Sequence, residues 1–181
     1  MKKSLAVFLV GIMVFGLATY AIGQTTSKGS SASTQKKTIL WHKYDEALEL
    51  AKKENKHVLV FFTTNWCGYC KKMKEYTFTD PRVFALMSEE FILAKVDGNS
   101  KNKVKVIDKD SNVVELTERE LSQAYRVRGY PTTVFLKPDG SRIAPISGYV
   151  KANQFEMVLK FIDTDSYEKM SFKEFIQKQK S

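Results

Sequence analysis

Residues 57–74 read HVLVFFTTNWCGYCKKMK, and this stretch decides the fold. Residues 58–62 are five consecutive apolar residues, a pattern typical of a strand covered on both faces in the middle of an α/β sheet. Polar residues 63–65 end that strand, and a lysine-rich segment with helix-forming residues follows residue 70. Cys67 and Cys70 lie between the predicted strand and the predicted helix, which is the pattern expected of a dithiol/disulfide redox site.

Cys67 and Cys70 are the only two cysteines in the 181 residues. An exported domain that is stabilised by structural disulfides usually carries at least four cysteines at scattered positions. A bridge that closes so short a loop adds little stability, because the stabilisation depends on loop length. Reactivity therefore explains the pair better than a structural role does.

Length and composition predict one globular domain. A chain of 181 residues with 43% hydrophobic and 27% charged residues is long enough to bury a core of its own. The formal charge of +9 comes mainly from dispersed lysines. We find no basic stripe interleaved with aromatic residues and no nucleic-acid motif, so the charge indicates a solvated basic surface without a nucleic-acid partner. We expect a monomer.

The first residues resemble an export signal rather than part of the fold. Two lysines follow Met1, residues 4–22 are almost wholly apolar, and small residues precede Gln24. This pattern predicts a signal peptide over residues 1–23. The apolar run is long enough that an uncleaved membrane anchor is the alternative. Residues 24–37 are rich in Ser, Thr, Gly and Lys and predict a flexible linker, so the domain should occupy residues 38–181 in the periplasm or another extracytoplasmic compartment.

Apolar periodicity and turn residues divide the domain into helices and strands. Trp41, Tyr44, Ala47, Leu48 and Ala51 predict the buried face of a helix over residues 41–53. Further helices are expected over residues 67–76, 81–87, 118–125 and 155–162 and after residue 171, and strands over 58–62, 91–96, 133–136 and 143–147. Residues 104–107 and 113–116 predict a hairpin inserted between core elements. The fold class is therefore α/β, with a central mixed β-sheet flanked by helices, a hairpin-like insertion and a C-terminal helical extension.

The spacing of the cysteines suits thiol–disulfide exchange. With Cys67 in the first turn of a helix and Cys70 one turn further, the sulfurs share one face and the Cα atoms lie about 5–6 Å apart. The helix N-terminus should stabilise the Cys67 thiolate. Cys67 would attack a substrate disulfide, Cys70 would then attack Cys67, and the reverse sequence would oxidise a dithiol.

Three other interpretations of the pair remain open. It could be half of a zinc site, although there is no second CxxC and only His42 and His57 could complete it. It could carry copper(I) between two thiolates, or it could be a structural bridge. We predict no metal and no cofactor.

Two motifs together resemble the thioredoxin superfamily. Residues 66–71 read WCGYCK after the apolar strand, and residues 129–132 read GYPT about sixty residues later. The resemblance covers roughly residues 40–163 and implies the thioredoxin fold. It also implies a cis Pro131 beside the CxxC, with the backbone of Tyr130 pairing with substrate. Trp66, Gly68 and Tyr69 complete the implied substrate-binding surface.

Within the superfamily, the chain resembles exported proteins of the SoxW and DsbD C-terminal type. The similar features are residues 74–81 (KEYTFTDP), the insertion before Thr117 and the tail beyond Ile162. This resemblance implies protein disulfides or dithiols as substrates, which the protein would keep reduced with electrons from a membrane donor.

Two positions depart from the thioredoxin pattern. Phe61 stands where thioredoxin has a buried aspartate that takes part in proton transfer from the second cysteine, and Lys95 lacks the acidic partner it would have there. Glu75 or water is then left to handle the Cys70 proton. Gly68-Tyr69 between the cysteines is neither the Gly-Pro of thioredoxin nor the Pro-His of strong oxidants. We favour a reductase, and a disulfide-donating oxidase of the same fold is the alternative.

Overall fold

The computed structural model describes residues 38–179 apart from residues 109 and 111. The predicted signal peptide (1–23) and linker (24–37) lie outside the described residues. Within the described part of the chain, no helix is both long enough and apolar enough to cross a bilayer.

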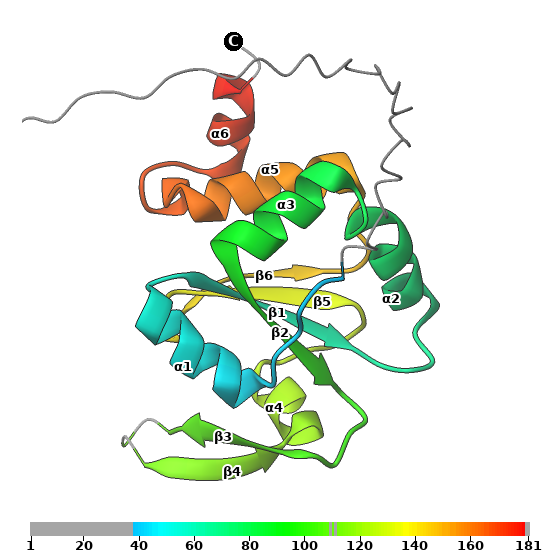
Figure 1. The fold of residues 1–181 in the computed structure, drawn as a ribbon, viewed down its shortest axis with the longest axis vertical. Helices are drawn as coiled ribbons and strands as arrows, with labels where there is room; N and C mark the ends of the chain where they lie inside the picture. Colours follow the sequence, from blue (N-terminus) through cyan, green and yellow to red (C-terminus); the bar gives the residue numbers. More distant parts are fainter. Residues whose placement is uncertain (1–37, 109, 111, 180–181) are drawn as a thin grey trace, which may run out of the picture. The chain divides into compact units, whose positions relative to one another are not determined.

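The described chain contains both helices and strands (Figure 1). In chain order they are α1 (Tyr44–Glu54), β1 (His57–Thr63), α2 (Gly68–Lys72), the π-helical turn η1 (Met73–Thr77), α3 (Pro81–Glu90), β2 (Phe91–Asp97), β3 (Lys103–Ile107), β4 (Val113–Thr117), α4 (Glu118–Ala124), β5 (Thr132–Leu136), β6 (Arg142–Ser147), α5 (Ala152–Asp163), the 3₁₀ turn η2 (Ser166–Glu168) and α6 (Phe172–Lys178).

Four strands form the central sheet in the order β2-β1-β5-β6. β1 pairs in parallel with β2 and antiparallel with β5, and β5 pairs antiparallel with β6. The predicted mixed sheet is therefore confirmed, with β1 as an inner strand. Residues 58–63 of β1 are all buried, as expected from an unbroken apolar run covered on both faces.

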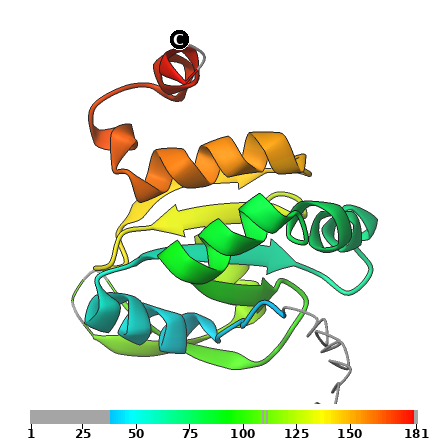
Figure 2. The ribbon, with the colours of Figure 1, turned by 45° about the horizontal axis from the view of Figure 1, so that its top comes forward.

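Helices cover both faces of this sheet (Figures 1 and 2). On one face, Leu59 and Phe61 of β1 pack in a core cluster with apolar residues of α3 and α5. On the other face, Val58, Val60 and Phe62 pack with residues of α1 and α4. We call these the α3/α5 face and the α1/α4 face. Side chains alternate between them because successive residues of a strand point to opposite sides of a sheet.

The two predicted additions to the sheet are confirmed. β3 and β4 pair antiparallel as a separate two-stranded sheet, and Val104 of β3 is buried in the cluster of the α1/α4 face. The C-terminal extension contains α6, the helix predicted after residue 171, and Ser171 and Glu174 form a capping box at its start. Phe175 anchors α6, with its ring centroid 5.3 Å from that of Phe161 on α5.

The prediction that placed Trp41 on the buried face of the first helix was wrong. α1 begins at Tyr44, after an N-cap at Lys43. The preceding residue runs beside β2 instead, with the His42 amide donating to the Leu93 carbonyl at 2.8 Å. Because that segment is extended, Trp41 packs against the cluster of the α3/α5 face, opposite the face that α1 covers.

The helix after the cysteines also differs in detail. Cys67 is the N-cap of α2 rather than part of its first turn. α2 ends at Lys72 and continues as the π-helical turn to Thr77, where the sequence predicted a regular helix to residue 76. The remaining predicted helices and strands lie within a few residues of their observed positions.

Candidate redox site

Strand register brings the loops that carry the two sequence motifs to one end of the sheet. Phe62 near the end of β1 pairs with Thr132, the first residue of β5, and Thr132 pairs with Ser147, the last residue of β6. The loop after β1, the loop before β5 and the loop after β6 therefore leave the sheet together. The amide of Gly148 donates to the carbonyl of Pro131 at 2.8 Å and ties two of these loops to each other.

The two cysteines are joined by a disulfide at this end of the sheet. The Cα atoms of Cys67 and Cys70 lie 5.2 Å apart, inside the range expected from the sequence. The Cys70 amide donates to the sulfur of Cys67 at 3.0 Å, so the side chain of Cys67 caps the start of α2. Cys67 is 4% exposed and Cys70 is 0% exposed, which makes Cys67 the sulfur that a partner can approach first.

Aromatic rings pack in the core cluster that contains the two cysteines. Phe61 is fully buried in the same cluster as both cysteines, and its ring centroid is 5.0 Å from that of Phe78. Trp41 packs against the same pair, 5.8 Å from each of the two rings. Among the described residues one acidic side chain is buried, Glu156 on α5, and it makes ion pairs with Arg82 and Lys160 at 2.9 and 2.8 Å.

The two ionisable groups considered for the Cys70 proton are both exposed. Lys95 pairs with Phe61 in the register of β1 and β2, but its side chain is in solvent. Glu75 lies on the π-helical turn and is also exposed. The structure brings neither of them into the buried cluster with Cys70.

An aromatic rim surrounds the disulfide. Trp66 and Tyr69 are 65% and 63% exposed, which is high for such large side chains. Trp66 makes an edge-on contact with Tyr130 at 6.1 Å between ring centroids, and Tyr69 lies 6.3 Å from Tyr149. The Lys72 ammonium lies 5.1 Å from the centre of the Tyr149 ring. Exposed aromatic side chains gathered around one point are typical of a surface that binds a partner.

Tyr130 is held in place by a glycine on a neighbouring loop. The peptide bond between Tyr130 and Pro131 is cis, as the thioredoxin resemblance predicts. The hydroxyl of Tyr130 lies so close to Gly98, just after β2, that a Cβ at Gly98 would collide with it. Gly68, in contrast, has open space where a Cβ would stand, so no packing contact there requires glycine.

Sequence analysis missed Tyr149 and Gly98 as parts of this end of the molecule. Tyr149 directly follows Gly148, and its place beside Tyr69 depends on the register of β5 and β6. The turn signal at Gly98 was visible after the second predicted strand, but its contact with Tyr130 depends on tertiary structure. A closer look at which loops leave the same edge of the sheet would have pointed to both.

The zinc interpretation is not supported by the positions of the histidines. His57 starts β1 while the cysteines follow its end, so about 20 Å of strand separates them. His57 interacts instead with Tyr167 and Asp165, each at 3.2 Å. Among the described residues there is no group of three or more His, Cys, Asp or Glu side chains that could hold a metal.

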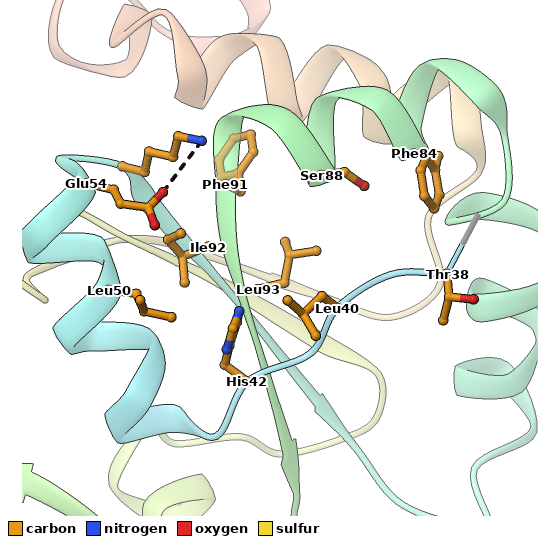
Figure 3. Close-up of a pocket in the computed structure, with 11 residues that line it drawn as sticks. Thr38, Leu40, His42, Leu50, Glu54, Phe84, Ser88, Phe91, Ile92 and Leu93 are labelled. Carbon is orange, nitrogen blue, oxygen red and sulfur yellow. Dashed lines mark ion pairs between the residues drawn. The ribbon is translucent and has the colours of Figure 1, made fainter.

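A separate hollow of about 450 Å³ lies on the outer edge of β2 (Figure 3). Leu50 of α1, Leu93 of β2 and Phe84 of α3 contribute to its lining, and His42 points into it from the extended segment. A Lys56–Glu54 ion pair at 3.8 Å borders it. No cysteine lines this hollow, so it is distinct from the redox site.

A CxxC pair at the end of a buried strand, next to a cis-proline loop in a mixed sheet, defines a thioredoxin-like protein. The family model described as Thioredoxin-like domain matches residues 44–163, and the chain belongs to this family. Among solved structures, it is similar to a thioredoxin-fold protein from Helicobacter pylori, with a TM-score of 0.59 and 28% identity over 70% of this chain and 80% of that one. It is also similar to a thioredoxin from Thermus thermophilus, with a TM-score of 0.54 and 29% identity over 67% of this chain and 85% of that one. The predicted thioredoxin fold is confirmed.

Curated relatives confirm the predicted likeness to DsbD. The thiol:disulfide interchange protein DsbD of Haemophilus ducreyi is 29% identical over 160 residues, which are 83% of this chain and 25% of that protein. The disulfide bond reductase DsbH of Chlamydia pneumoniae is 30% identical over 107 residues, 59% of this chain and 61% of that protein. The chain thus spans about a quarter of this DsbD and less than two thirds of this DsbH.

Proposed function

We propose that this protein is an extracytoplasmic thiol–disulfide oxidoreductase that reduces disulfides in partner proteins. The observation that carries the proposal is the Cys67–Cys70 pair, bonded at a Cα separation of 5.2 Å at the start of a helix. The names of the relatives, interchange proteins and a disulfide bond reductase, support the same chemistry.

The reaction runs from the dithiol to the disulfide seen in the structure. The Cys67 thiolate attacks one sulfur of a substrate disulfide, which forms a mixed disulfide and releases the other substrate sulfur as a thiolate. Cys70 then loses its proton and attacks the Cys67 sulfur, which releases the second substrate sulfur. The two released substrate thiolates take up the Cys70 proton, directly or through water, and one further proton from water. Two electrons pass to the substrate, and the protein is left with the Cys67–Cys70 disulfide.

The surrounding residues have supporting roles in this proposal. The Cys70 amide, 3.0 Å from the Cys67 sulfur, favours the Cys67 thiolate as a hydrogen-bond donor. The backbone of Tyr130 and the ring of Pro131 position the substrate chain, while Trp66, Gly68 and Tyr69 form the surface against which it lies. Phe61 leaves no carboxylate behind Cys70, so the Cys70 proton is transferred to water or to the departing substrate thiolate.

Export of the domain follows from the signal peptide proposed for residues 1–23, with the linker at 24–37 and the catalytic domain at 38–181. Outside the cytoplasm, a reductase needs a supply of electrons. We propose that a membrane protein reduces the Cys67–Cys70 disulfide after each turnover by the same exchange chemistry.

Trapping variants test the roles of the two cysteines. Cys70→Ser should accumulate mixed disulfides with substrate, because the resolving thiol is absent, and Cys67→Ser should not. Non-reducing electrophoresis followed by treatment with dithiothreitol measures the adducts. Equal trapping by both variants would contradict the assigned order of attack.

The reduction potential of the pair tests the direction of the reaction. Equilibration with glutathione should give a value near −270 mV, roughly that of thioredoxin, if the protein is a reductase. A value near −120 mV, roughly that of DsbA, would mean that the protein donates disulfides, and the proposed direction would be wrong.

A further inference from the structure

Positive charge gathers at the redox end of the molecule. Three of the segments that form this end, residues 64–77, 126–131 and 148–151, contain six basic side chains and one acidic side chain, and the end of β2 with the loop after it adds one of each, Lys101 and Asp97. The six are Lys71, Lys72, Lys74, Arg126, Arg128 and Lys151, and all of them are exposed. The described residues outside these three segments carry 16 basic and 19 acidic side chains, so the rest of the domain is slightly acidic.

The six cations of the redox end are unpaired within the described chain, as are ten of the other 16 described basic residues. The remaining basic residues make ion pairs, for example Arg82 with Asp80 at 3.0 Å, Lys137 with Glu168 at 2.6 Å and Lys103 with Glu115 at 3.0 Å. None of the six makes an ion pair with a described residue. Their charge is therefore available to an outside partner.

The six also lie close in sequence to the aromatic rim. Three are on α2 and the turn that follows it, directly after Cys70. Arg128 precedes Tyr130 by two residues in the cis-proline loop, and Lys151 follows Tyr149 by two residues as the N-cap of α5. A chain that binds across the disulfide along the rim thus meets cations from three separate loops.

We infer that the preferred substrates of this site are protein segments in which acidic residues flank the reacting disulfide. This inference rests on the proposed function and adds its substrate class. Each exposed charge contributes little alone, but several unpaired charges of one sign at one end of a protein steer a complementary partner and increase the association rate. The aromatic rim supplies contacts that do not depend on charge, and the cations select among disulfides.

Three cyclic peptides test the inference. Each contains one intramolecular disulfide in the same sequence, flanked by two Glu, two Gln or two Lys residues. The reduced full-length protein is mixed with each peptide, and the rate constant for its oxidation is divided by the rate constant of an uncharged reductant, tris(3-hydroxypropyl)phosphine, with the same peptide. This division removes differences in the intrinsic reactivity of the three disulfides.

We expect the normalised rate constant of the Glu peptide to exceed that of the Lys peptide about tenfold at low ionic strength, with the Gln peptide between them. The ratio should approach one at about 0.5 M salt, where charges are screened within a few ångströms. A stronger Cys67 thiolate, the other possible effect of nearby cations, would accelerate all three peptides equally.

Charge-reversal variants test which basic residues produce the preference for the Glu peptide. Arg128→Glu combined with Lys151→Glu should bring the ratio of Glu to Lys peptide to one or below. Lys169→Glu combined with Lys173→Glu makes the same change in net charge in the C-terminal extension. That extension packs near Phe161, at the end of α5 opposite Lys151, so this control should keep the wild-type ratio.

The outcomes distinguish failure of the inferred preference for acidic substrates from failure of the proposed reductase function. Equal normalised rates for all three peptides, or an equal loss of preference in both double variants, would overturn the inference and leave the proposed reductase standing. Failure of the reduced protein to react with any of the peptides would overturn the proposed function and the inference with it.

Discussion

The two faces of the central sheet bury polar groups in different ways. On the α1/α4 face, the hydroxyls of Tyr44 and Tyr125 lie 2.6 Å apart and satisfy each other. On the α3/α5 face, Cys67 and Cys70 are bonded to each other among Phe61, Phe78 and other apolar residues. One face carries a fixed hydrogen bond between distant elements, and the other carries a bond that can be made and broken.

This difference shows how a small domain can hold a reactive group within its apolar core. The apolar cluster that stabilises the α3/α5 face also surrounds the cysteines, and only Cys67 retains any exposure. Packing on this face therefore affects both folding and chemistry. Packing on the α1/α4 face should affect folding alone except where Tyr130 contacts both clusters, and neighbouring residues of β1 allow a direct test.

Phe61 and Phe62 make a matched pair for that test. Both are 0% exposed and adjacent in β1, but they belong to clusters on opposite faces. Phe61→Ala and Phe62→Ala should each lower the free energy of unfolding by about 3–5 kcal/mol, because each deletes a buried ring and leaves a cavity. Urea denaturation measured by circular dichroism gives both values.

Smaller substitutions at the same two positions separate an effect on the reaction from an effect on stability. Phe61→Leu should change the rate constant of disulfide reduction and the fluorescence of Trp41, whose ring lies 5.8 Å from that of Phe61. Phe62→Leu should leave the rate constant within about twofold of wild type while it costs a similar unfolding free energy. If both variants change the rate constant alike, the two faces are not independent.

The tyrosine pair allows the hydrogen bond of the α1/α4 face to be broken without loss of volume. Tyr44→Phe or Tyr125→Phe leaves one buried hydroxyl without its partner and should cost about 1–2 kcal/mol of unfolding free energy. The double substitution removes both hydroxyls and should cost less than the sum of the two single changes. Urea denaturation of the four proteins completes the cycle, and strict additivity would show that the 2.6 Å contact contributes nothing.

Local patterns in the sequence predicted most of the fold. The apolar run of β1, the proline and aspartate that open α3, and the capping boxes at Thr117 and Ser171 all report interactions within a few residues. The two motifs around Cys67 and Pro131 identified the superfamily and with it the mixed sheet flanked by helices. These features were predictable because each depends on short-range geometry.

The remaining features depend on contacts between distant elements. Trp41 fits the helical stripe of α1, yet the pairing of His42 with β2 turns it to the opposite face of the sheet. Tyr149 and Gly98 carry no local signal for a redox site, since their roles follow from strand register and from the position of Tyr130. The unpaired state of the basic residues around the site could not be predicted either, because ion pairs depend on tertiary proximity.

Tyr130 packs against both core clusters, so its support by Gly98 links the two faces at the redox end. Gly98→Ala should push the Tyr130 hydroxyl away and with it the ring that contacts Trp66. We expect a fall of about tenfold in kcat/KM for disulfide reduction, since small misplacements near a reacting centre are costly. Stopped-flow kinetics and tryptophan fluorescence measure the effect.

Gly129→Ala is the control for added bulk, because open space surrounds the position of its Cβ. It should leave the tryptophan spectrum of the wild type unchanged. If Gly98→Ala also leaves spectrum and kcat/KM unchanged, Tyr130 does not depend on Gly98 for its position.

Alkaline pH gives the mildest test of the tyrosine pair. Burial raises the pKa of Tyr44 above its ordinary value, reinforced by the neighbouring Tyr125. Burial likewise raises the pKa of Tyr125, although its hydrogen bond with Tyr44 and the charge of Arg142 oppose the shift. Both groups thus hold their protons in the folded protein at a pH where tyrosines of the unfolded chain, with a pKa of about 10, lose theirs.

The folded state therefore binds more protons than the unfolded state above pH 10, and the free energy of unfolding must fall as the pH rises. The contribution of the pair is fully present below pH 10. We expect a loss of about 1–2 kcal/mol between pH 10 and 11, about 1 kcal/mol for each tyrosine that stays protonated, and this loss should be absent from the Tyr44→Phe/Tyr125→Phe double variant. Urea denaturation at the two pH values measures the change in unfolding free energy. Tyrosinate absorbance, followed in parallel, reports when the tyrosines lose their protons. An equal loss in the double variant would assign the alkaline sensitivity to groups outside the α1/α4 face.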